Sequence, residues 1–156
     1  MNYNKDFMSL AVAEAKAGIR SKHGGPFGAV VIKDGKVIAS SHNCVLKDND
    51  STCHGEIAAI REAERKLKTF DLSGCELYTT AEPCPMCLAA ILWANISKVY
   101  FGCSIEDTAA VGFRDEKFEK MLNLNYEALR ELLEQKDREI CWEVFEEYKG
   151  LDKTIY

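Results

Sequence analysis

The chain contains no hydrophobic run long enough to cross a membrane. Its first residues also lack the layout of a signal peptide, in which basic residues precede an apolar stretch. No internal repeat, low-complexity tract or interdomain linker is present among the 156 residues. We therefore expect a single domain spanning 1–156, no membrane partner and a cytoplasmic location.

Basic residues are in the minority, with 20 Lys and Arg against 25 Asp and Glu, for a net charge of −5. Proteins that bind a phosphate backbone need clustered Lys and Arg, because such clusters release the counterions of the nucleic acid. Here the basic residues are scattered, and the segment 115–147 is rich in Glu. The composition therefore argues against a nucleic-acid partner, while leaving room for a local basic groove.

The seven cysteines are an odd number and come without a secretion signal, which argues against a disulfide framework. Cys84 and Cys87 belong to a spaced motif that could bind metal. The remaining cysteines are expected to be buried, reduced thiols that behave as small hydrophobic residues: Cys44, Cys53, Cys75, Cys103 and Cys141. Of these, Cys53 adjoins His54 and therefore has a second interpretation, as a fourth metal ligand.

The segments 54–56 (His-Gly-Glu) and 83–87 (Pro-Cys-Pro-Met-Cys) together supply one imidazole, two thiolates and one uncommitted carboxylate. Such a donor set suits zinc, and three protein ligands leave the fourth tetrahedral position open for water. A structural zinc site would normally be closed by a fourth Cys or His. The pattern therefore predicts one catalytic zinc ion per chain, held by His54, Cys84 and Cys87.

Glu56 is the predicted proton carrier. Zinc lowers the pKa of a bound water from 15.7 to about 7, and a carboxylate beside it can move protons to a substrate. Two residues along a helix rotate a side chain by about 200°, so His54 and Glu56 can serve one site only at a helix start. Cys84 and Cys87, three residues apart, share one face of a helix.

Hydrophobic periodicity and turn residues predict a layered α/β domain with a mixed sheet. The helix that begins near His54 is expected to be capped by Asp50, Ser51 or Thr52, and 43–52 is expected to be a loop. The other predicted elements are helices over 7–19, 83–93, 126–135 and 140–148, and strands over 27–32, 36–40, 76–80 and 98–101, with a turn at 34–35.

The pairing of H-x-E with P-C-x-x-C is the signature of zinc nucleobase deaminases. The whole chain resembles the zinc-dependent cytidine and purine deaminase superfamily and, within it, the bacterial guanine deaminases. This resemblance is carried by the segments 24–30, 52–56, 82–87 and 112–115 together with Asn43, Trp93 and Tyr156. It implies a cytidine-deaminase-like three-layer α/β/α fold, hydrolysis of guanine to xanthine and ammonia, and a small purine base as the partner.

The same resemblance implies roles in the purine pocket. Phe27 and Trp93 would be its aromatic walls, the Gly55 backbone would line the ring, and Asn43 and Asp115 would hydrogen-bond the base. Each residue also has a structural interpretation: Phe27 and Trp93 as core residues, Asn43 as a turn residue and Asp115 as a helix cap. The remaining histidines, His23 and His42, are interpreted as surface or loop residues.

The resemblance further implies a homodimer in which a C-terminal segment, about 125–156, is exchanged with the partner subunit. Tyr156 would then close the neighbouring active site. An ordinary chain end is the alternative for this residue, since termini are commonly poorly ordered.

The sequence departs from the family at the zinc histidine, where Cys53 and Gly55 replace alanines, and at Arg114, a position that is often acidic. These departures keep other substrates open, among them cytosine, guanosine and ammeline. A tRNA adenosine deaminase is a second interpretation, and a non-catalytic zinc module that mediates interactions is a third.

Overall fold

The computed structural model of the chain describes residues 2–123, 135, 136 and 138. It separates into two compact units, Met1–Glu119 and Lys120–Tyr156, and the fold given below is that of the first. The helices predicted over 126–135 and 140–148 lie outside the described residues, apart from Gln135 at the margin. Cys141 and Tyr156 also lie outside them, so the predicted exchange of the C-terminal segment stays a prediction.

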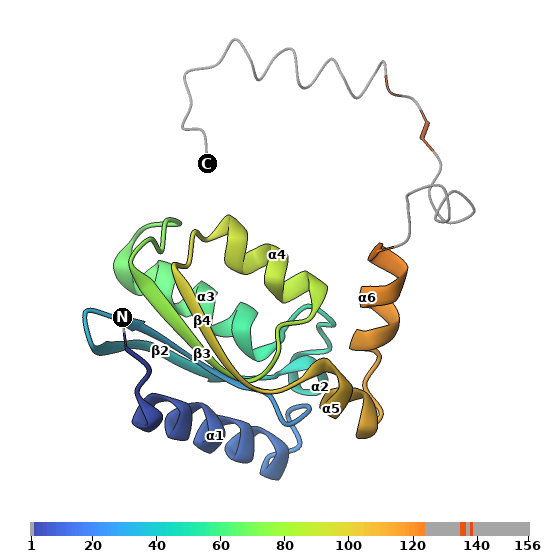
Figure 1. The fold of residues 1–156 in the computed structure, drawn as a ribbon, viewed down its shortest axis with the longest axis horizontal. Coiled ribbons are helices and arrows are strands. Elements are labelled where there is room, and N and C mark those ends of the chain that lie inside the picture. Colours follow the sequence, from blue (N-terminus) through green and yellow to red (C-terminus); the bar gives the residue numbers. More distant parts are fainter. Residues whose placement is uncertain (1, 124–134, 137, 139–156) are drawn as a thin grey trace. The chain divides into compact units, whose positions relative to one another are not determined.

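A four-stranded sheet in the order β2-β1-β3-β4 forms the centre of this unit (Figure 1). Strand β1 pairs antiparallel with both β2 and β3, whereas β4 runs parallel to β3. The sheet is therefore mixed, as predicted. The strands are β1 Gly28–Lys33, β2 Lys36–His42, β3 Cys75–Ala81 and β4 Lys98–Cys103.

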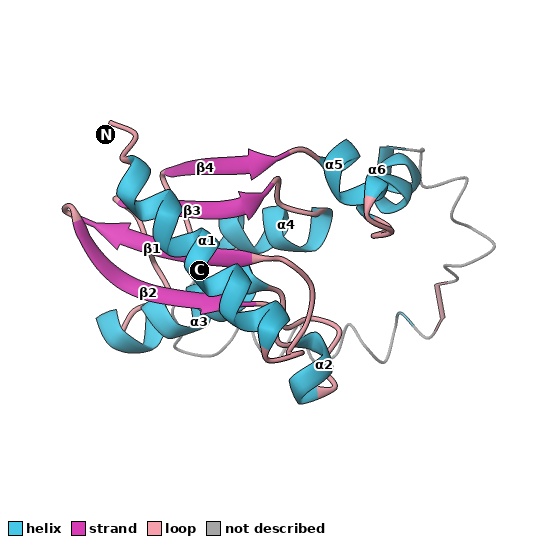
Figure 2. Ribbon diagram, turned by 90° about the horizontal axis from the view of Figure 1, so that it is seen from below, coloured by secondary structure: helices cyan, strands magenta, loops and turns pink. Residues whose placement is uncertain are grey.

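Helices cover both faces of this sheet, because successive side chains of a strand point to opposite faces. Val30 and Ile32 of β1 pack with Ala11 of helix α1 (Lys5–Arg20). Ala29 and Val31 pack on the other face, in a cluster that also contains residues of α3 (Gly55–Leu67) and α4 (Pro85–Trp93). Figure 2 shows α1 and α3 on opposite sides of the strands. The predicted three-layer α/β/α architecture is confirmed.

The hairpin between β1 and β2 turns at Asp34 and Gly35, whose φ angles are 50° and 72°. Two consecutive residues with positive φ are typical of a type I′ turn, which matches the twist of the strands that it joins. The turn predicted at these residues is therefore present. It returns the chain to His42, the last residue of β2.

The expected cap of the helix after residue 53 is wrong. The N-cap of α3 is His54, which makes no side-chain capping hydrogen bond. Asp50 is already engaged in its own turn, where its Oδ1 accepts hydrogen bonds from the backbone N–H of Thr52 at 2.8 Å and from its hydroxyl at 2.7 Å. Asp50 is therefore not the cap of α3, and His54 occupies the N-cap position.

Three short helices were not predicted. Helix α2 (Val45–Asp48) lies within the expected loop 43–52, and α5 (Ile105–Ala110) and α6 (Asp115–Asn123) follow β4. The capping box of Ser104 and Asp107 at the start of α5 is a local signal that the sequence does contain. Among the described residues, no helix has both the length and the apolar character to cross a membrane.

Candidate active site

Two helix starts bring together the residues predicted to bind zinc. His54 is the N-cap of α3, Cys84 is the N-cap of α4, and Cys87 lies in the first turn of α4. The Nδ1 atom of His54 lies 3.5 Å from the Sγ atom of each cysteine, and the three donor atoms all lie within 4.8 Å of one another. Segments about 30 residues apart in the sequence thus meet at one point.

The donor geometry fits a tetrahedral ion. Zinc bonds to nitrogen at about 2.0 Å and to thiolate sulfur at about 2.3 Å, so a bond angle of about 109° at the ion separates these two atoms by about 3.5 Å. The observed distances of 3.5 Å are close to this separation. A zinc ion therefore fits between His54, Cys84 and Cys87 with little movement of the side chains.

The pKa values of the two thiols are shifted in opposite directions. A hydrogen bond from the Cys87 thiol is the main reason that the pKa of Cys84 is lowered to about 4, and the helix start favours this thiolate further. The pKa of Cys87 is raised, first by its contact with Cys84 and then by burial. A cation bound here would favour the thiolate form of both cysteines, and a proton shared by the pair would be released on binding.

Glu56 lies beside these donors and is 5% exposed. Its Oε1 accepts a hydrogen bond from the Thr79 hydroxyl at 3.3 Å, and its Oε2 faces the Cys87 sulfur at 3.6 Å. Burial raises the pKa of this carboxyl, because the low-dielectric surroundings disfavour its charged form. Such a group can hold a proton and release it again close to the three donor atoms.

Asp115 is the first residue of α6, and the charges of Cys84 and His54 affect the pKa of its carboxyl. Burial raises the pKa of its carboxyl, the Cys84 sulfur raises it further, and His54 opposes the shift. Arg114, one of the departures from the family, lies with its guanidinium 5.0 Å from the centre of the Phe118 ring. The structure therefore brings Asp115 near the donors and directs its basic neighbour to an aromatic ring.

The backbone carbonyl of Phe27 lies next to both Asn43 and Gly55. The carbonyl of Phe27 accepts a hydrogen bond from the Asn43 N–H at 2.9 Å. A Cβ atom added at Gly55 would lie 3.1 Å from that oxygen. The methyl group that this chain lacks at residue 55 would thus press on the backbone of the loop that carries Phe27.

The amide of Asn43 serves the turn as well. Its side chain is 4% exposed, and Oδ1 accepts a hydrogen bond from the N–H of Val45 at 3.0 Å. Asn43 is therefore a turn residue, as its alternative interpretation from the sequence predicted. That hydrogen bond fixes the side chain in one orientation, which is also what a base-binding amide requires.

The loop that carries Phe27 is braced by Thr80, whose hydroxyl donates to the Pro26 carbonyl and accepts from the Gly28 N–H, both at 3.1 Å. The Phe27 ring meets Phe113 edge to face, with centroids 4.8 Å apart. Phe113 was not predicted as a site residue, although the segment 112–115 was part of the resemblance. A side chain at Gly25 would collide with both rings at 2.6 and 2.7 Å.

Trp93 occupies a different place from the other candidates. It is the last residue of α4 and is 67% exposed. Six residues of helix separate it from Cys87, which corresponds to about 9 Å along the axis. The structure brings His54, Glu56, Cys84 and Cys87 into contact. Asp115 lies near enough for the charges of Cys84 and His54 to shift its pKa, whereas Trp93 stays a prediction.

The other cysteines only partly match the expectation of buried thiols. All six described cysteines are free; Cys53 and Cys75 are buried, Cys44 is half-buried and Cys103 is exposed. The expectation was therefore wrong for Cys103, which is the last residue of the edge strand β4. A position at the end of an edge strand leaves a side chain with few neighbours to cover it.

Comparison with known families agrees with this geometry. Residues 1–103 match the family described as the cytidine and deoxycytidylate deaminase zinc-binding region. The chain belongs to this family. It is accordingly a zinc-dependent hydrolytic deaminase. His54, Cys84 and Cys87 form a described group of side chains that could hold the metal ion.

Two relatives show how far the likeness extends. Guanine deaminase from Bacillus subtilis is 46% identical over 115 residues, which are 74% of this chain and 73% of that protein. A tRNA-specific adenosine deaminase from Agrobacterium fabrum is 47% identical over 106 residues, 67% of this chain and 68% of the relative. Sequence identity alone thus places the chain near two kinds of deaminase.

The structural comparison reaches further along the chain. The X-ray structure of guanine deaminase from Bacillus subtilis matches with a TM-score of 0.91 at 36% identity and covers 100% of this chain and 99% of that one. The fold of the described residues is therefore that of a bacterial guanine deaminase.

Proposed function

We propose that this protein hydrolyses guanine to xanthine and ammonia, using one zinc ion per chain held by His54, Cys84 and Cys87. The observation that carries the proposal is the match along the full chain to the guanine deaminase from Bacillus subtilis, at a TM-score of 0.91. The buried carboxyl of Glu56 beside the three donors supports the hydrolytic chemistry. A place in purine metabolism follows from the substrate.

Zinc bound to this triad would supply a water of lowered pKa as the nucleophile. The protein supplies the proton transfers. Glu56 would take a proton from the attacking water on a carboxylate oxygen and give it to a ring nitrogen as the hydroxide adds to the amine-bearing carbon. It would then take the proton of the added hydroxyl and give it to the amine, so that ammonia leaves and the carbonyl of the product forms. Thr79 keeps that carboxyl in place through its hydrogen bond to Oε1, and burial favours the protonated form between the two transfers.

The base would be held by groups from separate elements. Asp115 would accept hydrogen bonds from purine N–H groups, and the Asn43 amide would bond the opposite edge. Phe27 would provide an aromatic face, with the Gly55 backbone lining the ring and Trp93 as a second wall. Directional contacts of this kind, combined with aromatic faces, suit a flat polar base.

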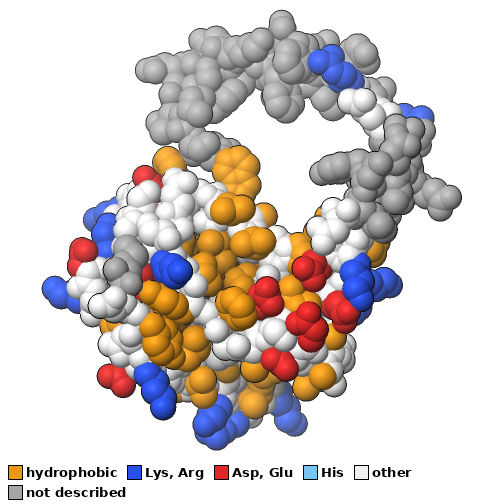
Figure 3. All heavy atoms as spheres, in the orientation of Figure 1, with side chains coloured by type: hydrophobic (Ala, Val, Ile, Leu, Met, Phe, Trp, Pro, Cys, Tyr) orange, Lys and Arg blue, Asp and Glu red, His pale blue; other side chains and the backbone are white. Residues whose placement is uncertain are grey.

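We further propose a homodimer in which the segment of about 125–156 reaches the partner and Tyr156 closes its active site. Among the described residues no strand pairs with the outer edge of β4, and an open edge with apolar neighbours is typical of an association surface. Figure 3 shows hydrophobic side chains gathered on the face that displays α4 and β4. The exposed ones there include Leu88, Leu92, Trp93 and Phe101.

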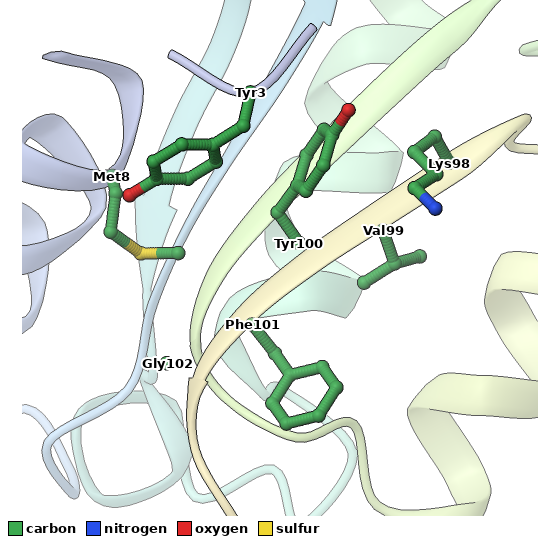
Figure 4. A pocket seen from close by; sticks show the side chains of 7 residues that line it. All are labelled: Tyr3, Met8, Lys98, Val99, Tyr100, Phe101 and Gly102. Carbon is green, nitrogen blue, oxygen red and sulfur yellow. The ribbon is translucent and has the colours of Figure 1, made fainter. Parts of the chain in front are cut away.

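The edge of β4 is also hollowed on the side towards the N-terminus. A shallow pocket there is lined by Tyr3, Met8 and residues 98–102, with Tyr3 and Tyr100 facing each other (Figure 4).

A cytoplasmic enzyme with no membrane partner is consistent with the bacterial origin of the relatives.

The proposed activity is tested by ammonia release from a panel of substrates. Guanine should be turned over much faster than cytosine, guanosine or ammeline, with xanthine as the product identified by its absorbance. Fast turnover of one of the others, without turnover of guanine, would move the substrate assignment and leave the metal chemistry intact.

A tRNA adenosine deaminase is the second candidate, because such an enzyme is 47% identical over two thirds of this chain. The net charge of −5 disfavours it. Salt-sensitive binding of tRNA together with formation of inosine would support this candidate, whereas guanine turnover without tRNA binding would remove it.

A further inference from the structure

A second group of imidazole and sulfur donors lies outside the proposed active site. His23 follows α1, His42 ends β2, and Cys44 is the N-cap of α2. Their donor atoms all lie within 4.8 Å of one another, and all three side chains are half-buried. We propose that His23, His42 and Cys44 form a second binding site for a divalent transition-metal ion, with zinc as the best fit.

The orientation of His42 is the first argument. Its Nδ1 lies 2.8 Å from Oε2 of Glu14, and Oε1 of the same carboxyl accepts from the Ser40 hydroxyl at 3.0 Å. A carboxylate accepts only, so Nδ1 carries the proton and Nε2 presents its lone pair. Metal-binding histidines commonly have such a carboxylate partner, because it fixes the tautomer and makes the free nitrogen more basic.

The nitrogens of the pair already face each other. The Nε2 of His42 lies 2.9 Å from the Nδ1 of His23, with the ring centroids 5.1 Å apart. Two nitrogens bound at about 2.0–2.1 Å to a tetrahedral ion are about 3.3 Å apart. A small opening of the pair would therefore admit an ion, with Cys44 as the sulfur ligand and water in the fourth position.

The donor types select the ion. Two imidazoles and one thiolate suit zinc among the common divalent ions, whereas magnesium and calcium prefer oxygen ligands. Cys44 also lies near Asp48 and Cys53. The Cys53 thiol, however, points to Oδ2 of Asp48 at 3.9 Å, so the oriented imidazoles are the stronger partners for Cys44.

An ion there would tie three elements together around Asn43. His42 and Cys44 are the neighbours of Asn43 in the sequence, and the carbonyl of His23 accepts from the N–H groups of Leu46 and Lys47 at 2.9 and 3.1 Å. The ion would clip the end of β2, the start of α2 and the loop after α1 to one another. Metal binding itself does not depend on the proposed substrate; only the benefit for base binding by Asn43 rests on that proposal.

The test measures zinc per chain in the full-length protein after loading with zinc and dialysis against a weak chelator. Wild type should keep two ions, whereas Cys44→Ala and His23→Gln should each keep one. Cys103→Ala, which removes a cysteine outside both groups, is the matched control and should keep two. One ion in the wild type would overturn the proposal and leave His23 and His42 as a pair that shares a proton.

Two further measurements keep the result unambiguous. Cobalt substitution should give a thiolate-to-metal absorption band that falls by about a third in Cys44→Ala, because three thiolate ligands become two. Cys53→Ala should keep both ions; loss of the second ion in this variant but not in His23→Gln would overturn the proposed ligand set. The zinc content does not depend on guanine turnover. A protein that does not turn over guanine could still bind two ions, so the two proposals can fail separately.

Discussion

The two donor groups of this protein, His54 with Cys84 and Cys87, and His23 with His42 and Cys44, have similar chemistry but differ in the position of their carboxylate. Glu56 accepts a hydrogen bond from the Thr79 hydroxyl and faces the thiol of Cys87, a member of the first group, and among the described hydrogen bonds none joins it to the imidazole. Glu14 bonds directly to the imidazole of His42 in the second group. The first carboxylate is therefore free to move protons, whereas the second is used to orient a ligand.

Burial strengthens this contrast. Glu56 is 5% exposed, and its pKa is raised by that burial, while the side chain of Glu14 is 27% exposed. A carboxyl that reacts as an acid needs a pKa near the working pH, whereas a carboxylate that orients an imidazole needs only its charge. The same residue types can thus make a catalytic site or a structural one.

The largest expected effect is on Glu56. Glu56→Gln should keep zinc but lower kcat for guanine by at least about 10²–10⁴-fold, because the amide cannot carry the proton. The measurement is ammonia release together with zinc content. Glu62→Gln is the control: this carboxyl lies on the same helix but contacts Ser41 and Lys66, and the variant should keep the wild-type rate. A Glu56→Gln enzyme with full rate would contradict the proposed proton transfer.

The matching change in the second group is Glu14→Gln. It should weaken zinc binding by His23, His42 and Cys44 by about 10–100-fold, since loss of such a partner typically has this effect. The rate of deamination at saturating guanine should not change. A competition titration with a zinc chelator measures the affinity, and equal loss of zinc from both sites would show that Glu14 supports the fold in general.

Asp115 tests whether a third carboxyl belongs to the substrate. Asp115→Asn should raise KM for guanine by about tenfold or more, because a hydrogen bond to a charged group contributes about 1.5–3 kcal/mol. Steady-state kinetics measure this, with zinc content as the control for the fold. A fall in kcat at constant KM would assign the residue to the proton transfers beside Glu56.

The smallest effect is expected at Thr79, a positioning residue. Thr79→Val removes the hydroxyl that bonds Glu56 and should lower kcat by about 2–10-fold, which corresponds to about 0.5–1.5 kcal/mol for one hydrogen bond. Thr52→Val, at an exposed turn, is the control. A change in KM alone would show that the hydroxyl acts on the base pocket and not on the carboxyl.

Several elements could be predicted from local patterns. The strands alternate between the two faces of the sheet, the turn at Asp34 and Gly35 has its typical residues, and the helix with His54 begins where expected. Helix α2, by contrast, is held by tertiary contacts: two of its backbone N–H groups bond the carbonyl of His23. Its four residues carry too little periodicity to predict a helix.

The sequence by itself determined the donors of the first group, because short spacings at two helix starts fix which side chains converge. It also determined the mixed α/β architecture through the periods of its apolar residues. Only the tertiary structure decided the second group, since the return of β2 beside β1 places His42 and Cys44 next to His23, and α1 adds Glu14. Contacts between elements of this kind depend on packing and register, which no local pattern contains.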